Sequence, residues 1–166
     1  MVVRYAMMAL VLSGVTLVAE PASSSERRPM GIGLCARLAE LDVAHDAGYD
    51  YVEVSAQEVN GLSGPEFEAL LARVKTSPIP VRAANIFLPG TLKVVGPAVD
   101  VTRQTEHVER TMSRLSALGV ETLVFGSGKA REVADGFSRQ EAFDQLVAFG
   151  RLAAEVATRR GIVIAL

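Results

Sequence analysis

The sequence has little of the residue types on which several common binding chemistries depend. One cysteine, Cys35, in 166 residues excludes a disulfide framework and a thiolate metal site. There is no tryptophan and only 5% of residues are aromatic, so a stacking platform for nucleic-acid bases is not expected. The formal net charge of −2 supplies neither a basic patch for nucleic acid nor a polybasic membrane anchor. We therefore expect no nucleic-acid partner.

The first 29 residues differ from the rest. A short basic start precedes an apolar run from Tyr5 to Ala19, and a polar linker rich in serine follows. This order is typical of a secretory signal peptide, since a membrane-spanning helix needs about 20 apolar residues. We predict a signal peptide at 1–22, a linker at 23–29 and export to the periplasm or the extracellular space. An uncleaved anchor or a misassigned start codon is the alternative, and without a signal the protein would be cytoplasmic.

From Met30 onward, short apolar runs alternate with amphipathic stretches. The runs at 30–36, 51–56, 79–88, 121–126 and 161–166 are rich in valine and isoleucine and are predicted to be strands. Helices are predicted between them, near 36–48, 63–75, 100–119 and 138–161. Ser63 with Glu66, and Ser138 with Glu141, form the pattern of a capping box at two helix starts.

Helix positions are also predicted from the spacing of apolar residues. In the third predicted helix, Val101, Val108, Met112 and Leu115 lie on one stripe, which should face the core. The cluster Glu106, His107 and Glu109 on the same helix is predicted to be a solvated face, and His45 has no partner at metal-ligand spacing.

Strict alternation of strands and helices implies parallel strands joined by right-handed crossovers. If the strands keep their sequence order, all four helices cover one face of the sheet and the other face stays bare. Closing the sheet into a barrel would cover it, and a complete eightfold barrel takes about 250 residues. We therefore predict that 30–166 is the N-terminal half of a (β/α)8 TIM barrel, with about five parallel strands and four helices, truncated in its fifth strand. An open doubly wound sheet is disfavoured because Gly31 to Gly33 lacks a phosphate-binding glycine pattern.

In parallel barrels the active site lies at the carboxyl ends of the strands. That rule selects Cys35 after the first strand, Glu53 and Ser55 at the second, Asn85 and Phe87 at the third, and Gly126, Ser127, Gly128, Lys129 and Arg131 after the fourth. Among them, the candidate substrate-binding residues are Glu53, Asn85, Ser127, Lys129 and Arg131. A carboxylate can bind sugar hydroxyls or accept a proton, and an amide both donates and accepts hydrogen bonds. Each has a structural alternative, namely tying strand ends together for Glu53 and capping a loop for Asn85. The glycines around Ser127 free backbone N–H groups for an anion, beside two cationic side chains, although a plain flexible turn would use the same residues.

The stretches YVEVS, ANIFLPG, LVFGSGKAREVADGFS and GIVIAL resemble the first half of the sugar phosphate isomerase/epimerase group within the xylose isomerase-like TIM barrels. The resemblance implies proton transfer between adjacent carbons of a keto or aldo sugar or sugar phosphate. It also implies a divalent metal (Mn, Mg or Zn) held by residues on strands five to eight, none of which is present here. We accordingly expect no catalytic residue and no metal ligand in this chain.

Two further interpretations follow. The chain could be a non-catalytic half-barrel binding module that self-associates through its exposed sheet edges. Zinc endonucleases that act at abasic DNA sites share the superfamily fold and use histidine at the ends of strands three and four, where this sequence has Asn85 and Ser127. That difference, together with the missing basic patch, counts against DNA repair.

Overall fold

The computed structural model describes residues 30–166, and the predicted signal peptide and linker lie outside this range. Within it, five strands form one parallel sheet in the order β1-β2-β3-β4-β5. The strands are β1 (Gly33–Cys35), β2 (Tyr51–Ser55), β3 (Val81–Asn85), β4 (Thr122–Val124) and β5 (Val163–Ala165). The prediction of five parallel strands in sequence order is confirmed.

The helices lie between the strands, as predicted, with two additions. They are the 3-10 helix η1 (Leu38–Glu40), α1 (Leu41–Asp46), α2 (Ala56–Gly61), α3 (Gly64–Thr76), α4 (Val101–Ala117), η2 (Gly128–Arg131) and α5 (Arg139–Arg160). None of the helices among the described residues has the length and apolar character needed to cross a membrane.

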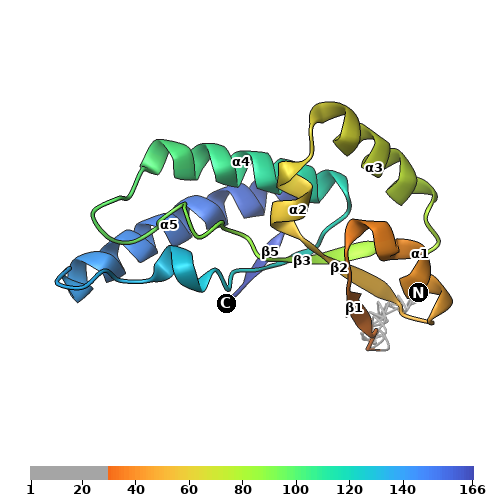
Figure 1. Ribbon diagram of the computed structural model, residues 1–166, viewed down its shortest axis with the longest axis horizontal. Coiled ribbons are helices and arrows are strands. Elements are labelled where there is room, and N and C mark those ends of the chain that lie inside the picture. The colour runs from red at the N-terminus through yellow and green to blue at the C-terminus, as the bar shows by residue number, and fades with distance from the viewer. Residues whose placement is uncertain (1–29) are drawn as a thin grey trace, which may run out of the picture.

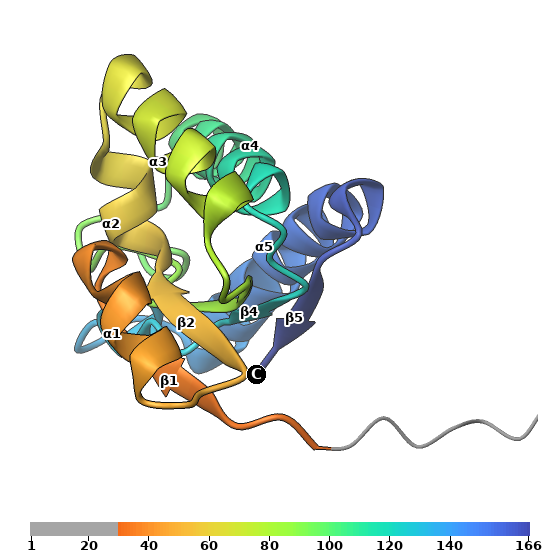
Figure 2. The same cartoon turned by 90° about the vertical axis from the view of Figure 1, so that its right-hand side faces the viewer.

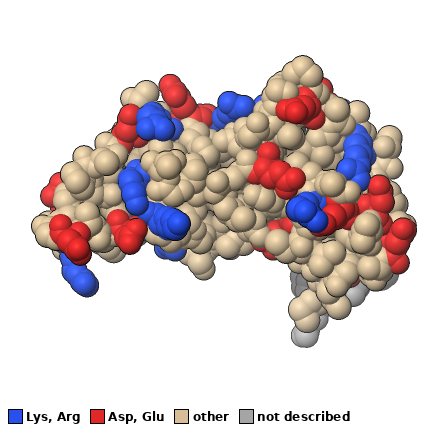
Figure 3. Space-filling model, viewed as in Figure 1, with Lys and Arg blue, Asp and Glu red and all other residues tan. Residues whose placement is uncertain are grey.

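The helices cover one side of the curved sheet, and the opposite side is left open within 30–166 (Figures 1 and 2). Val52, Val54 and Leu123 face the helices and are fully buried. The residues that alternate with them, such as Glu53 and Ser55, are only partly buried. The sheet therefore has a covered outer face and an uncovered inner face, as the topology predicts. On the face shown in Figure 3, acidic and basic side chains are interspersed.

Helix starts follow the local rules of capping. Ser63 and Glu66 exchange both hydrogen bonds of a capping box at the start of α3. At α5, the Ser138 hydroxyl accepts from the Glu141 N–H at 3.3 Å, and the reciprocal bond is not found among the described residues. The second predicted box is therefore half formed.

Three details of the sequence prediction are wrong. The second strand ends at Ser55, because the Ser55 hydroxyl caps α2 by accepting from the Glu58 N–H at 3.2 Å. The third strand is shorter than 79–88. Val101 was placed on the buried stripe of α4 but is 63% exposed, since it is the first residue of the helix, whereas Val108, Met112 and Leu115 are buried.

Candidate functional site at the carboxyl ends of the strands

The strand register places four polar side chains on the uncovered inner face. Cys35 pairs with Glu53 across β1 and β2, and Ser55 pairs with Asn85 across β2 and β3. Register partners in a parallel sheet project to the same side, and residues two apart on one strand do so too. Because Val54 points into the helix layer, these four side chains project to the opposite, inner side.

Asn85 is the most constrained of them. Its Nδ2 donates to the Cys35 Sγ at 3.1 Å, while its buried Oδ1 has no donor among the described residues. A buried acceptor left unpaired costs about 1–3 kcal/mol, so a hydrogen-bond donor at this position would stabilise the fold.

The loop that follows β4 is tied to the loop that follows β3. The Ser127 hydroxyl accepts from the Leu88 N–H at 2.9 Å, and the Lys93 Nζ donates to the Lys129 carbonyl at 2.7 Å. Gly90 lies against the stem of Lys129 so closely that a Cβ at residue 90 would be 3.0 Å from the Lys129 Cβ. The two strand ends therefore act as one structural unit.

A cavity of about 420 Å³ opens between these loops. Its polar lining includes Asn85, Ser127 and Lys129, with Gly126 and Gly128 exposing backbone, and Ile86 forms an apolar part of the wall. The structure thus brings three of the five predicted substrate-binding residues to one cavity. Whether they bind a sugar stays a prediction.

Glu53 and Arg131 lie elsewhere. The Glu53 carboxylate has no hydrogen-bond partner among the described residues and lies beside Cys35 on the inner face. The Arg131 guanidinium donates to the Gly126 carbonyl and stacks over the Phe125 ring at 5.1 Å from its centroid. Arg131 thus holds its own loop closed and is absent from the lining of the cavity that Asn85 shares with Ser127 and Lys129.

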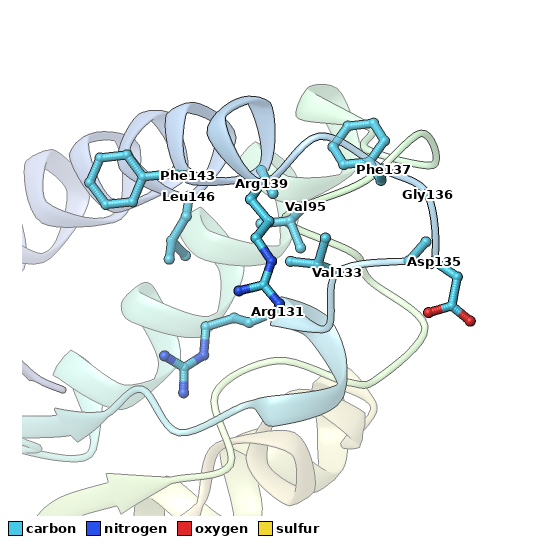
Figure 4. A pocket seen from close by; sticks show the side chains of 11 residues that line it. Val95, Arg131, Val133, Asp135, Gly136, Phe137, Arg139, Phe143 and Leu146 are labelled. Carbon is cyan, nitrogen blue, oxygen red and sulfur yellow. The ribbon is translucent and has the colours of Figure 1, made fainter.

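Arg131 borders a different cavity of about 510 Å³, beside the first turns of α5. In Figure 4 the Arg139 side chain extends into this cavity toward Val133, while the Asp135 carboxylate points away from it. Phe143 at its rim is 60% exposed. This cavity is separate from the mouth formed by the strand ends.

The sequence predicts that His107 lies on a solvated face, and the structure places it differently. It is half-buried, and its Nε2 lies 3.0 Å from the Phe87 carbonyl while its Nδ1 lies 3.2 Å from the Asn60 Nδ2. Burial lowers the pKa of His107, and the positive charge of Arg110 acts in the same direction, although the bond to the Phe87 carbonyl opposes them. The predicted solvated face is therefore wrong for this residue.

The two acidic residues of that cluster lie in different surroundings from His107. Glu109 forms an ion pair with Arg159 of α5 at 2.5 Å, which joins two neighbouring helices, and Glu106 is exposed. The helical spacing contains one signal for His107, which stands three residues after Gln104 and four before Thr111, and the structure buries both of these. That spacing indicates the side of the helix on which His107 lies but not its partners.

The residues present do not fit a divalent metal site. Nowhere in 30–166 do three or more His, Cys, Asp or Glu side chains gather where they could hold a metal ion. At the strand ends only Glu53 and Cys35 come together, and two such groups fall short of the usual ligand sets for Mn, Mg or Zn.

The fold agrees with the comparison to known families. The chain belongs to the xylose isomerase-like TIM barrel family, whose model matches residues 41–166. Sugar epimerases are among the solved structures that it resembles. A comparison with curated protein sequences finds no match.

Three of these structures illustrate the likeness. D-psicose 3-epimerase from Clostridium cellulolyticum H10, solved with D-tagatose, is 16% identical with a TM-score of 0.66, and the match covers 82% of this chain and 52% of that one. D-allulose 3-epimerase from Methylomonas sp. is 19% identical with a TM-score of 0.66, covering 81% and 50%. 3-Keto-D-glucoside 4-epimerase from E. coli is 19% identical with a TM-score of 0.62, covering 82% and 55%. At these identities the likeness shows the fold, and the chain spans about half the length of each relative.

Proposed function

We propose that residues 30–166 form the sugar-binding half of a sugar or sugar phosphate isomerase/epimerase barrel. The observation that carries the proposal is the cavity between the β3 and β4 ends, where Asn85, Ser127 and Lys129 converge in a member of a family that includes sugar epimerases. The Asn85 amide, which lines the cavity, would bind a sugar hydroxyl after a small turn of its side chain, and the Lys129 ammonium would attract a hydroxyl or a phosphate oxygen.

The reaction we propose for the whole protein is metal-dependent proton transfer between adjacent carbons of a keto or aldo sugar. These residues supply no metal site and no pair of proton-transferring groups, so those parts would come from outside this chain. Glu53, on the inner face, would bind a hydroxyl of the same substrate. We further propose that the protein is exported.

Sugar binding is tested by titrating D-fructose into the ¹⁵N-labelled chain and following its amide signals. We expect Asn85→Ala and Lys129→Met each to weaken binding about 5- to 30-fold, as loss of one hydrogen bond to a polar or charged partner predicts. Lys75→Met on α3, far from the cavity in the sequence and exposed, is the matched control and should bind as the wild type does. If D-fructose binds Asn85→Ala and Lys129→Met as tightly as it binds Lys75→Met, the assignment of the sugar to this cavity is contradicted.

Catalysis is tested separately. We expect no epimerisation of D-fructose by the purified chain with added Mn²⁺ or Mg²⁺, and turnover well above a no-protein control would overturn this part. The native transcript gives a second check: an in-frame continuation of β5 that bears a glutamate after Leu166 supports the enzyme, whereas a stop codon there supports the candidate that follows.

The second candidate function is a non-catalytic half-barrel binding module that self-associates. It is favoured by the apolar side chains at the two open edges of the sheet, because Ile32 beside β1 is 67% exposed and Val163 on β5 is 66% exposed. Sedimentation velocity distinguishes it: Ile32→Lys and Val163→Lys should dissociate the assembly, and Val43→Lys on α1, at a position 63% exposed, should not. A monomeric wild type would rule this candidate out.

A further inference from the structure

The end of β3 holds a strained residue at the cavity wall. Ile86 has φ +49°, a left-handed conformation that β-branched residues rarely adopt, and its side chain is 52% exposed in the cavity mouth. Such a conformation costs about 1–3 kcal/mol and persists only where the surroundings enforce it. The contacts on either side of Ile86 should therefore be strong.

Phe87 and Leu88 provide those contacts. The Phe87 ring is fully buried, with ring centroids 5.7 Å from Phe125 and 6.1 Å from Phe149. The Leu88 N–H donates to Ser127, and its carbonyl accepts from the Gln57 Nε2 at 3.0 Å. The remaining anchor is the Phe87 carbonyl, which is held by His107.

The two partners of His107 favour one tautomer. With the Asn60 amide as it lies here, its Nδ2 faces the His107 Nδ1 at 3.2 Å and donates to it, so Nδ1 is the acceptor in this arrangement. The ring hydrogen then lies on Nε2 and is donated to the Phe87 carbonyl. A proton added at Nδ1 would oppose the Asn60 Nδ2 donor and remove that bond. The charged ring then fits only if the Asn60 amide turns over to present its Oδ1, which has no partner among the described residues.

The charged groups around the ring come from one element. A cavity of about 250 Å³ beside His107 is lined by Arg103, Glu106 and Arg110 of α4. The segment after β3 and helix α2 contribute uncharged groups there, among them Thr91 and Asn60. A protonated ring would therefore be repelled by the arginines at its present position and drawn toward water and Glu106.

We propose that His107 is a positioning residue for the mouth of the barrel: its neutral imidazole fixes the Phe87 carbonyl, and through it Asn85 and Ile86, and protonation loosens this hold. The link to ligand binding rests on the proposed function, because it assumes that Asn85 contacts the sugar. The hold on the β3 end does not depend on that assumption.

The test is an NMR titration of the labelled full chain from pH 8 down through the midpoint of the His107 ring signals, since burial lowers the pKa of His107. We expect the Asn85 side-chain amide and the Leu88 backbone amide to shift with the same midpoint as the His107 ring. In His107→Gln, whose amide keeps a donor for the Phe87 carbonyl but cannot titrate, both signals should stay constant. His45→Gln, on the exposed face of α1, is the matched control, and its Asn85 and Leu88 amide signals should shift with pH as they do in the wild type.

Two outcomes would overturn the proposal: a titration of Asn85 and Leu88 that persists in His107→Gln, or one that is missing from the wild type while the His107 ring titrates. A D-fructose arm separates the two levels of inference. We expect D-fructose to bind the wild type at least 3-fold more weakly one pH unit below the measured His107 midpoint than at pH 8, and to bind His107→Gln equally at both. If the amides respond but no sugar binds at any pH, the proposed function fails and the positioning role stands.

Discussion

The hydrogen bond between Ser127 and Leu88 gives the most direct measure of how firmly the two strand ends are joined. Ser127→Ala removes the Oγ acceptor and leaves the Leu88 N–H, in a residue only 3% exposed, without its partner. An unsatisfied buried donor costs about 1–3 kcal/mol. Because Ser127 also has φ +40°, Ser127→Gly removes the same bond but relieves left-handed strain worth about 1 kcal/mol.

The two variants therefore separate the hydrogen bond from the strain. We expect Ser127→Ala to lower the free energy of unfolding by about 1–3 kcal/mol, and Ser127→Gly to lower it by about 1 kcal/mol less than Ser127→Ala does. Urea unfolding followed by circular dichroism measures both, and hydrogen exchange of the Leu88 amide should quicken in each. An unfolding free energy of Ser127→Ala within about 0.3 kcal/mol of the wild type would refute the claim that this bond joins the loops, since that is the scatter between independent sites.

Three other perturbations test the packing and the electrostatics. Burial lowers the folded-state pKa of His107 below its unfolded value of about 6.5, so the unfolded chain binds more protons than the folded chain in this pH range. The urea midpoint of unfolding should therefore fall as pH drops from about 7 through the folded-state pKa. In His107→Gln the midpoint should depend less on pH. Gly90→Ala should push the Lys129 stem away and cost about 1–2 kcal/mol in urea unfolding, with recovery in Gly90→Ala/Lys129→Gly. Gly33→Ala should lower the free energy of unfolding by about 1–3 kcal/mol, because the new Cβ would lie 2.2 Å from the Tyr51 Cε2. Tyr51→Ala in the same chain should restore part of this loss. If the effects of the two substitutions simply add, the clash is not the cause.

The order and direction of the strands could be predicted from the sequence because they depend on short-range signals. Ser63 and Glu66 mark a helix start within four residues, and Gly161 ends α5 in a left-handed conformation with φ +69°. The same local rules failed at Ser55, where one serine ends a strand and caps a helix at once. A valine-rich run that ends in serine gives no indication of which role applies.

The environment of His107 could not be predicted because its partners are distant in the sequence. Phe87 is 20 residues away and Asn60 is 47 residues away, and neither spacing is part of a helical pattern. A histidine flanked by glutamates reads as a solvated face unless the neighbouring loop is known to turn a carbonyl toward it. The position of the Arg131 side chain could not be predicted for a similar reason, since its guanidinium folds back onto the Gly126 carbonyl in its own loop.

The distribution of side chains on the inner face argues for a barrel more strongly than the topology alone. In a doubly wound sheet a second helix layer covers this face, so both faces of every central strand are apolar. Here the row at the carboxyl ends of β2 and β3 is polar, with Ser55 beside Asn85, and the next row pairs Glu53 with Ala83 and Ala83 with Thr122. Helices packed on these rows would bury the Glu53 carboxylate without a partner, at a cost of several kcal/mol. In a barrel the same carboxylate lies near the open mouth, where water or a ligand can reach it.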